Sequence, residues 1–330
     1  MYKILFLTSL IMSTLITISS QSWLGMWIGL EINLLSFIPL MNEKKNMMST
    51  ESSIKYFIIQ ALASTVILMS IILNSNIIPN LISESIYLIL NSALFMKMGA
   101  APFHFWFPEM IEGLSWMNSL ILLTWQKLAP MVIFNYKINS ILSVSVIISC
   151  MLISGLMGIN QISIRKIMAY SSINHIGWML SSMLFNQTIW LIYFLIYSIM
   201  SLNIIIVLKK FNLFYLKQLF LHMKTNKTMN FFFICNFLSL GGLPPFIGFF
   251  PKWITIQTLI MNNALSLTLL MVILTLLTLF IYTRITFSSI ILSFSELKLF
   301  FSNQNYSMFM IYTNFLSITG LIGCMMIFNF

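Results

Sequence analysis

The sequence contains no aspartate and very little charge of either sign. Charged residues make up 7% of the 330 residues, whereas roughly a quarter of a soluble domain is charged. This composition excludes an ordinary soluble protein, because a water-facing surface cannot be built from so few charges. Apolar stretches near 20 residues recur along the chain, each long enough to cross about 30 Å of hydrocarbon. The alternating pattern of barrel strands is missing, so we predict an all-α integral membrane protein.

Cysteine is scarce, and the motifs of soluble chemistry are missing. The three cysteines, Cys150, Cys235 and Cys324, are widely spaced in apolar stretches. Their spacing supports neither a metal nor an iron–sulfur site. The sequence has no GxGxxG, Walker, HExxH or GxSxG motif, and Gly241-Gly242 lacks the lysine that follows in a phosphate loop. We therefore expect this chain to bind no metal and no cofactor.

Methionine and phenylalanine are abundant, with 26 and 29 copies. Codons rich in A and T specify both residues, which points to an AT-rich genome such as that of an organelle. The first apolar stretch, Tyr2–Ser20, has only Lys3 as a basic flank and no small-residue cleavage site. We therefore interpret it as a membrane span and not as a signal peptide.

Apolar runs separated by polar residues predict about eleven spans in one transmembrane domain, 1–330. Two spans are interrupted, the fourth by Lys97–Pro102 and the ninth by Gly241–Pro245. Glycine and proline open the helical hydrogen-bond ladder there. Such breaks persist in a bilayer only where protein or a water-lined cavity satisfies the backbone, as in many ion transporters. The spans lie near 3–20, 23–41, 56–74, 82–107, 115–135, 138–159, 167–185, 188–208, 229–262, 264–284 and 307–329.

Basic residues predict the orientation. Of the 17 lysines and arginines, thirteen flank spans on the side of the N-terminus and only Lys137 lies on the other side. Positive loops stay on the side from which insertion starts, so we expect the N-terminus on the matrix (or cytoplasmic) side and the C-terminus opposite. The net charge of +10 is then mainly a topology signal, and we expect no nucleic-acid partner. The thirteen are Lys3, Lys44, Lys45, Lys55, Arg165, Lys166, Lys209, Lys210, Lys217, Lys224, Lys227, Arg284 and Lys298.

Three lysines, Lys97, Lys127 and Lys252, remain within the predicted spans, and Glu31 falls in the middle of the second span. A charge at the bilayer centre costs roughly 2.5–3.5 kcal/mol, so such residues face the bundle interior or water and suggest function. Each also has a structural interpretation. Lys252 can reach an interface, Lys127 can end a span, and Lys97 can cap freed carbonyls. Glu31 can form a structural ion pair.

The residue types favour proton transfer. A lysine taken out of water holds its proton less tightly, and a nearby carboxylate restores the hold. A glutamate that approaches or retreats therefore switches a lysine between holding and releasing a proton. Arginine stays protonated, and a sodium site would prefer carboxylates and carbonyls. Lysines at bilayer depth on several helices thus predict a proton relay.

Two of the three histidines lie in predicted spans. His104 follows the break in the fourth span, and His175 lies in the seventh. Either can pass protons through water because imidazole titrates near neutrality. Each can equally be a hydrogen-bonded histidine in a polar pocket. His222 falls in the basic loop 209–228 and is expected to be solvated.

Five segments occur in order between about residues 20 and 285 and resemble a known family. They resemble the subunit 2 family of mitochondrial NADH:ubiquinone oxidoreductase (complex I), and the AT-rich composition is similar to arthropod, especially insect, members. The segments are Gly29–Asn33, Lys97–Glu109, Thr124–Pro130, Ser171–Trp178 and Gly241–Trp253.

The resemblance implies an antiporter-like, Mrp-type module shortened by three N-terminal helices, a multi-pass subunit of the mitochondrial inner membrane. It implies that Glu31 and Lys97 form the family's Glu/Lys pair, Lys127 is the central relay lysine and Lys252 belongs to the second broken helix. One proton per cycle would cross this subunit, driven by NADH oxidation and ubiquinone reduction elsewhere in the complex. NADH, FMN, iron–sulfur clusters and ubiquinone then belong to other subunits. The partners implied are neighbouring antiporter-like subunits, accessory subunits and membrane lipids.

Three alternatives share these features. A stand-alone cation/proton antiporter would have the same broken helices and buried lysines. A structural spacer would only link pumping neighbours. A sister antiporter-like subunit of the same complex would be considerably longer, and Lys97–Glu109 resembles subunit 2 better.

Overall fold

The structure is a computed structural model that describes residues 2–42, 46–76, 83–223, 227–244 and 246–293, together with Phe315 and Gly320. These residues are almost entirely α-helical, and the β-structure among them is one isolated bridge between Ser163 and Tyr215. The predicted all-α class is confirmed. The chain divides into two compact units, Met1–Ser149 and Cys150–Phe330. The expectation of one transmembrane domain over the whole chain stays a prediction.

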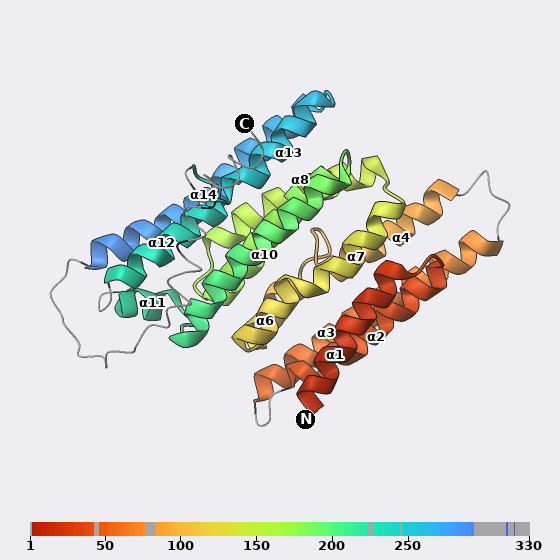
Figure 1. Ribbon diagram of the computed structural model, residues 1–330, viewed down its shortest axis with the longest axis horizontal. Coiled ribbons are helices and arrows are strands. Elements are labelled where there is room, and N and C mark those ends of the chain that lie inside the picture. The colour runs from red at the N-terminus through yellow and green to blue at the C-terminus, as the bar shows by residue number, and fades with distance from the viewer. Residues whose placement is uncertain are drawn as a thin grey trace. The chain divides into compact units, whose positions relative to one another are not determined.

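The first unit is a bundle of helices in which α1, α2 and α3 lie side by side (Figure 1). The helix α3 also packs on α4 and α5, and α7 packs on α4. The helices are α1 (Tyr2–Ser19), α2 (Trp23–Met41), α3 (Met47–Asn76), α4 (Ser83–Met98), α5 (Trp106–Gly113), α6 (Trp116–Leu123), α7 (Trp125–Tyr136) and α8 (Ser140–Ile159), the last of which ends in the second unit.

In the second unit α10 packs on α9 and α12, and α13 packs on α9, α10 and α14. Except for Arg165 and Lys166, every residue of α9 is buried. This burial makes α9 the most enclosed helix of the unit, although it carries several polar residues. The helices are α9 (Ile164–Met183), α10 (Gln187–Lys210), α11 (Leu216–Met223), α12 (Lys227–Gly241), α13 (Phe249–Met261) and α14 (Leu265–Ser293).

Seven helical stretches in the described part of the chain are long and apolar enough to cross a membrane: α1, α2, α3, α6 with α7, α8, α10 and α14. Three other predicted spans are helical but fall short of that measure. The spans 82–107 and 229–262 are broken into shorter helices, and polar residues lower the hydropathy of α9. These three carry Lys97, Lys252 and His175. The eleventh predicted span, 307–329, lies outside the described residues apart from Phe315 and Gly320.

Small residues bring α1 and α2 close together. Ser13, Thr14 and Thr17 are buried on α1, and a Cβ atom at Gly29 of α2 would meet the Thr17 side chain and backbone and the Ser13 carbonyl. Close approach through small residues is the usual way in which membrane helices associate. The contact fixes the segment of α2 that carries Glu31.

The predicted span 115–135 is confirmed as the stretch Trp116–Tyr136, but it contains a break that was not predicted. The helix α6 ends at Leu123 and α7 begins at Trp125. The hydroxyl of Thr124 donates to the carbonyl of Leu120, so the side chain at the break satisfies a carbonyl at the end of α6. The segment 209–228, predicted as a loop, contains α11, and His222 lies within that short helix.

Two further spans are longer than predicted. The helix α3 begins at Met47 because the Asn46 side chain accepts from the Met48 amide and caps the helix. The helix α14 continues past Arg284 to Ser293. Arg284 donates to the carbonyl of Ile159 at 3.2 Å, and this hydrogen bond links α14 to the end of α8.

Candidate functional site

The break after α4 is a glycine C-cap. Gly99 has φ +74°, its amide donates to the carbonyl of Met96, and the amide of Ala100 donates to Phe95. This pair of bonds is the Schellman motif, which places a left-handed residue just past the helix end. Glycine adopts that conformation without the Cβ penalty. The interruption predicted at Lys97–Pro102 is confirmed.

The break after α12 has the same geometry. Gly242 has φ +75°, its amide donates to the carbonyl of Ser239, and the amide of Leu243 donates to Leu238. The break predicted at Gly241–Pro245 is therefore confirmed for its described residues, and α13 begins at Phe249. In the described part of each unit, one helix thus ends at a glycine with positive φ.

A Schellman motif leaves the last carbonyls of the helix without helical partners. In α4, the amide of Gln60, on α3, donates to the carbonyl of Lys97 at 3.3 Å. In α12, the ammonium of Lys252 donates to the carbonyls of Gly241 at 2.8 Å and Leu240 at 3.4 Å. Capping of freed carbonyls, the structural role considered for Lys97, is thus performed here by Lys252. Lys252 is 6% exposed and does not extend to a surface.

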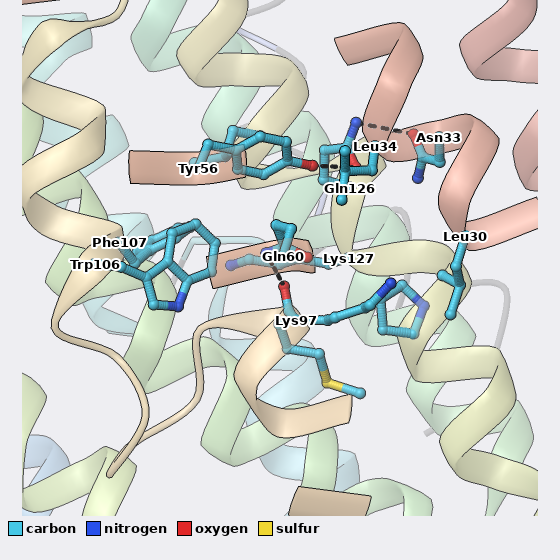
Figure 2. Close-up of a pocket in the computed structure, with 13 residues that line it drawn as sticks. Leu30, Asn33, Leu34, Tyr56, Gln60, Lys97, Trp106, Phe107, Gln126 and Lys127 are labelled. Carbon is cyan, nitrogen blue, oxygen red and sulfur yellow. Dashed lines mark hydrogen bonds between the residues drawn. The ribbon is translucent and has the colours of Figure 1, made fainter. Parts of the chain in front are cut away.

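Lys97 and Lys127 line one cavity in the first unit (Figure 2). Lys97 comes from the last turn of α4 and is 7% exposed, and Lys127 comes from the first turn of α7 and is 1% exposed. The space that the centre of a water molecule can occupy is about 20 Å³, which is enough for one water. The polar residues that line it besides the lysines are Asn33, Tyr56, Gln60 and Gln126.

Hydrogen bonds between three helices shape one wall of this cavity (Figure 2). The amide nitrogen of Gln126, on α7, donates to the side-chain oxygen of Asn33, on α2, at 3.0 Å. The hydroxyl of Tyr56, on α3, donates to the amide oxygen of Gln126 at 3.5 Å. Gln126 therefore ties α7 to both neighbours at the residue before Lys127, which holds that lysine toward the cavity.

Lys127 lies near the centre of the span Trp116–Tyr136 and not at its end. The break at Thr124 places it at the start of α7 while keeping it deep in the unit. Its ammonium stands 5.5 Å from the centroid of the Phe107 ring, a cation–π distance. The break at Thr124, which sequence reasoning missed, is what brings a lysine and a helix start together.

Glu31 is half-buried on α2, two residues before Asn33. Its carboxylate is the predicted partner of the Lys97 ammonium, although Glu31 does not line the cavity of Lys97 and Lys127. The two groups do not form a salt bridge, since within the described ranges the ion pairs at 4 Å or less are those of Lys55 with Glu51 and Glu109. A pair of Glu31 with Lys97 therefore stays a prediction.

His104 lies between α4 and α5, after the glycine cap. It is 2% exposed, its Nδ1 donates to the carbonyl of Pro102 at 3.3 Å, and its ring lies 4.5 Å from that of Phe105. It does not line the cavity of Lys97 and Lys127. This placement matches the hydrogen-bonded histidine considered from the sequence, and a part in proton transfer stays a prediction.

His175 belongs to a buried group of tyrosines in the second unit. Its Nδ1 lies 2.9 Å from the hydroxyl of Tyr193, and its ring centroid is 4.9 Å from that of Tyr197. Tyr282, on α14, is buried as well. Sequence reasoning missed these tyrosines. The sequence does contain a sign of them, because Tyr193 and Tyr197 are one helical turn apart and lie on one face of the helix.

The described residues contain no group of three or more histidine, cysteine or acidic residues that could hold a metal ion. The expectation that this chain binds no metal stays a prediction. The chemistry of the site consists instead of two ammonium groups, neutral amides and a carboxylate around a space for water.

The sequence from residue 20 to residue 278 matches the NADH:quinone oxidoreductase/Mrp antiporter transmembrane family. The chain belongs to this family. It is 50% identical to NADH-ubiquinone oxidoreductase chain 2 of Anopheles gambiae, covering 98% of this chain and 97% of that protein. It is also 50% identical to the chain 2 of Aedes aegypti over 96% of this chain and 95% of that one. The resemblance to insect members of the family is confirmed.

Chains of two solved membrane complexes have the same fold. A chain of respiratory complex I from Thermus thermophilus with bound aureothin superposes with a TM-score of 0.85 at 20% identity, covering 98% of this chain and 78% of that one. A chain of the Mrp complex from Dietzia sp. superposes with a TM-score of 0.72 at 17% identity, covering 85% and 59%. The predicted antiporter-like fold is confirmed.

Proposed function

We propose that this chain is a core membrane-arm subunit of complex I in the mitochondrial inner membrane and that it translocates protons. The near full-length identity to insect chain 2 proteins supports its membership of NADH:ubiquinone oxidoreductase. NADH, FMN, iron–sulfur clusters and ubiquinone are then bound by other subunits. Its partners are the neighbouring antiporter-like and accessory subunits and membrane lipids. Its N-terminus faces the matrix and its C-terminus the intermembrane space, as the basic residues predict.

The observation that carries the proton-transfer proposal is the cavity shared by Lys97 and Lys127. Two like charges in one enclosed space repel each other more strongly than in water. Their protonation states are therefore coupled, so that protonation of one disfavours protonation of the other. A water molecule in the cavity gives the proton a route between them. The pair thus acts as a unit that holds one proton more easily than two.

Glu31 supplies the switch in this proposal. A carboxylate close to a lysine favours the charged form of the lysine, and among the described residues Glu31 and Lys97 are not locked in a salt bridge. When Glu31 approaches, Lys97 holds its proton, and when Glu31 retreats, the proton moves to Lys127. Gln60 holds the backbone carbonyl of Lys97, so the side chain changes partners on a fixed helix end.

Lys252 is the corresponding group in the second unit. As an ammonium it donates to the carbonyls of Leu240 and Gly241. Loss of its proton weakens these bonds, because a charged donor makes a stronger hydrogen bond than a neutral one. Proton movement at Lys252 is thereby linked to the hold on the end of α12. His104 and His175 are further candidates for carrying protons between the lysines.

The proposal is tested with Lys127→Met in the assembled complex, reconstituted into vesicles. We expect NADH oxidation to persist while protons pumped per NADH fall by one, the number expected per cycle. Lys209→Met, at the exposed end of α10, is the matched control and should leave the ratio unchanged. Pumping at normal stoichiometry by a fully assembled Lys127→Met complex contradicts the relay.

A stand-alone cation/proton antiporter is the second candidate, favoured by the structural similarity to the Mrp complex. It predicts that the purified chain alone exchanges sodium for protons across vesicles. A structural spacer predicts that neutralising Glu31, Lys97, Lys127 and Lys252 together leaves pumping intact. We favour the complex I subunit, because the chain matches chain 2 proteins along almost their whole length.

A further inference from the structure

Asn91, in the middle of α4, is a buried amide whose role neither the relay nor the fold explains. Its side chain is 0% exposed. Within the described part of the chain, neither its Nδ2 nor its Oδ1 has a hydrogen-bond partner. Buried polar groups in native proteins are satisfied by protein or by ordered water. A fully buried amide with both ends open to hydrogen bonding therefore points to bound water.

The position of Asn91 on α4 connects two spaces. Tyr87, Asn91 and Met98 are spaced i, i+4 and i+11, so they lie on one face of the helix. Met98 lines the cavity of Lys97 and Lys127. Tyr87 lines a hollow of about 270 Å³ together with Glu84, Lys137 and Asn139. At about 1.5 Å per residue, Asn91 lies about 6 Å from the level of Tyr87 and about 10 Å from that of Met98.

The helix α7 runs beside α4 between the same two spaces. At the cavity end, Lys127 and Pro130 face Lys97 and Met98 across it. Further along, the rings of Phe95 and Phe134 lie 5.1 Å apart. At the hollow, the ammonium of Lys137 stands 5.1 Å from the Tyr87 ring. The helix α7 thus packs beside the stretch of α4 that contains Asn91.

We propose that Asn91 binds water that continues the proton path from the cavity of Lys97 and Lys127 to the hollow at Glu84, Tyr87 and Lys137. An amide suits this task because it both donates and accepts hydrogen bonds and carries no charge that would trap a proton. Glu84 provides an acceptor where the path opens. The hollow lies on the Lys137 side of the membrane, which the basic residues predict to be the intermembrane space. This inference rests on the proposed proton-transfer function.

Pumping by Asn91 variants distinguishes a role in binding water from a purely structural role. Replacing a buried polar group that lacks a partner with an apolar group of similar shape is neutral or stabilising. Asn91→Leu should then assemble normally whichever role the residue has, so that pumping separates the two. Asn91→Ser keeps a group that binds water. Asn91→Met offers a more adaptable apolar side chain and replaces the leucine variant if that variant does not assemble.

The experiment measures protons pumped per NADH in vesicles that contain the complete complex. We expect Asn91→Leu (or Met) to lower the ratio by one while NADH oxidation persists, and Asn91→Ser to restore it. The matched control is Asn118→Leu on α6, whose amide donates to the carbonyl of Leu40 and which does not line the cavity. Asn118→Leu should leave the ratio unchanged.

Lys127→Met, measured in parallel, separates failure of this inference from failure of the proposed function. If Lys127→Met lowers pumping and Asn91→Leu or Met does not, the path through Asn91 is overturned and the relay stands. If neither lowers pumping, both are overturned. A loss of pumping that Asn91→Ser does not restore also overturns the path, because a hydroxyl that binds water should then have sufficed.

Discussion

The ammonium of Lys252 lies 2.8 Å from the carbonyl oxygen of Gly241, the last residue of α12. Lys252 therefore caps the end of a broken helix with the same ammonium that the proposed proton relay requires to be titratable. Its second bond, at 3.4 Å, is to the carbonyl of Leu240, and the carbonyl at the corresponding position of α4, that of Lys97, accepts from the neutral amide of Gln60. The capping group is thus a neutral amide in the first unit and an ammonium in the second.

Lys252→Arg should separate the cap from the relay. Arginine keeps donors for the carbonyls of Leu240 and Gly241 but stays protonated, so we expect assembly to be preserved and pumping to be lost. Lys252→Met removes the donors as well and should destabilise the complex by about 1–3 kcal/mol. Thermal unfolding and pumping, measured on both variants, check this. Normal pumping by Lys252→Arg would exclude proton release at this residue.

Gly242→Ala should destabilise the break after α12, whereas Gly241→Ala should not. Gly242 has φ +75°, and a Cβ atom there would lie 2.7 Å from Cδ of Lys252. The left-handed conformation alone costs about 1–2 kcal/mol for a residue with a Cβ. At Gly241 a Cβ atom would lie 3.4 Å from Tyr282, an ordinary contact. The thermal stability of the assembled complex distinguishes them, and equal stability of the two variants would contradict the prediction.

Gln60→Leu should loosen the end of α4. The substitution leaves the carbonyl of Lys97 without its donor, at a cost of about 1–3 kcal/mol. We expect lower thermal stability together with reduced pumping, because Lys97 is no longer held at the cavity. Ser64→Ala on the same helix is the control, since its hydroxyl bonds only within α3, to Ala61. If Gln60→Leu is as stable and active as Ser64→Ala, the hydrogen bond from Gln60 to the carbonyl of Lys97 is needed neither for stability nor for pumping.

Glu31→Gln should reduce pumping without affecting assembly. Glutamine keeps the shape of the side chain but removes the charge that, in the proposed switch, stabilises the charged form of Lys97. Because no salt bridge joins Glu31 and Lys97 in the described structure, little stability should be lost. Glu51→Gln, on the exposed ion pair with Lys55, is the control and should leave protons per NADH unchanged. A Glu31→Gln complex that pumps like this control would remove Glu31 from the switch.

Much of the fold could be predicted from the sequence because membrane spans are local features. A run of apolar residues marks a helix, and glycine and proline mark where it stops. The breaks at Gly99 and Gly242 were predicted on this basis. The break at Thr124 was not predicted, because neither glycine nor proline stands there. The Thr124 hydroxyl donates to the carbonyl of Leu120 instead. The short helix α11 was missed because it lies in a segment rich in lysine, which is typical of a loop between spans.

The sequence by itself determined the class of the protein and the four charged residues that topology does not explain. Charge in hydrocarbon is costly wherever it occurs, so counting is enough to isolate Glu31, Lys97, Lys127 and Lys252. Only the tertiary structure decided how they are placed. Lys97 and Lys127 share a cavity, Lys252 caps α12, and among the described residues Glu31 forms no salt bridge with Lys97. Such pairings depend on contacts between helices distant in sequence, and no local pattern encodes them.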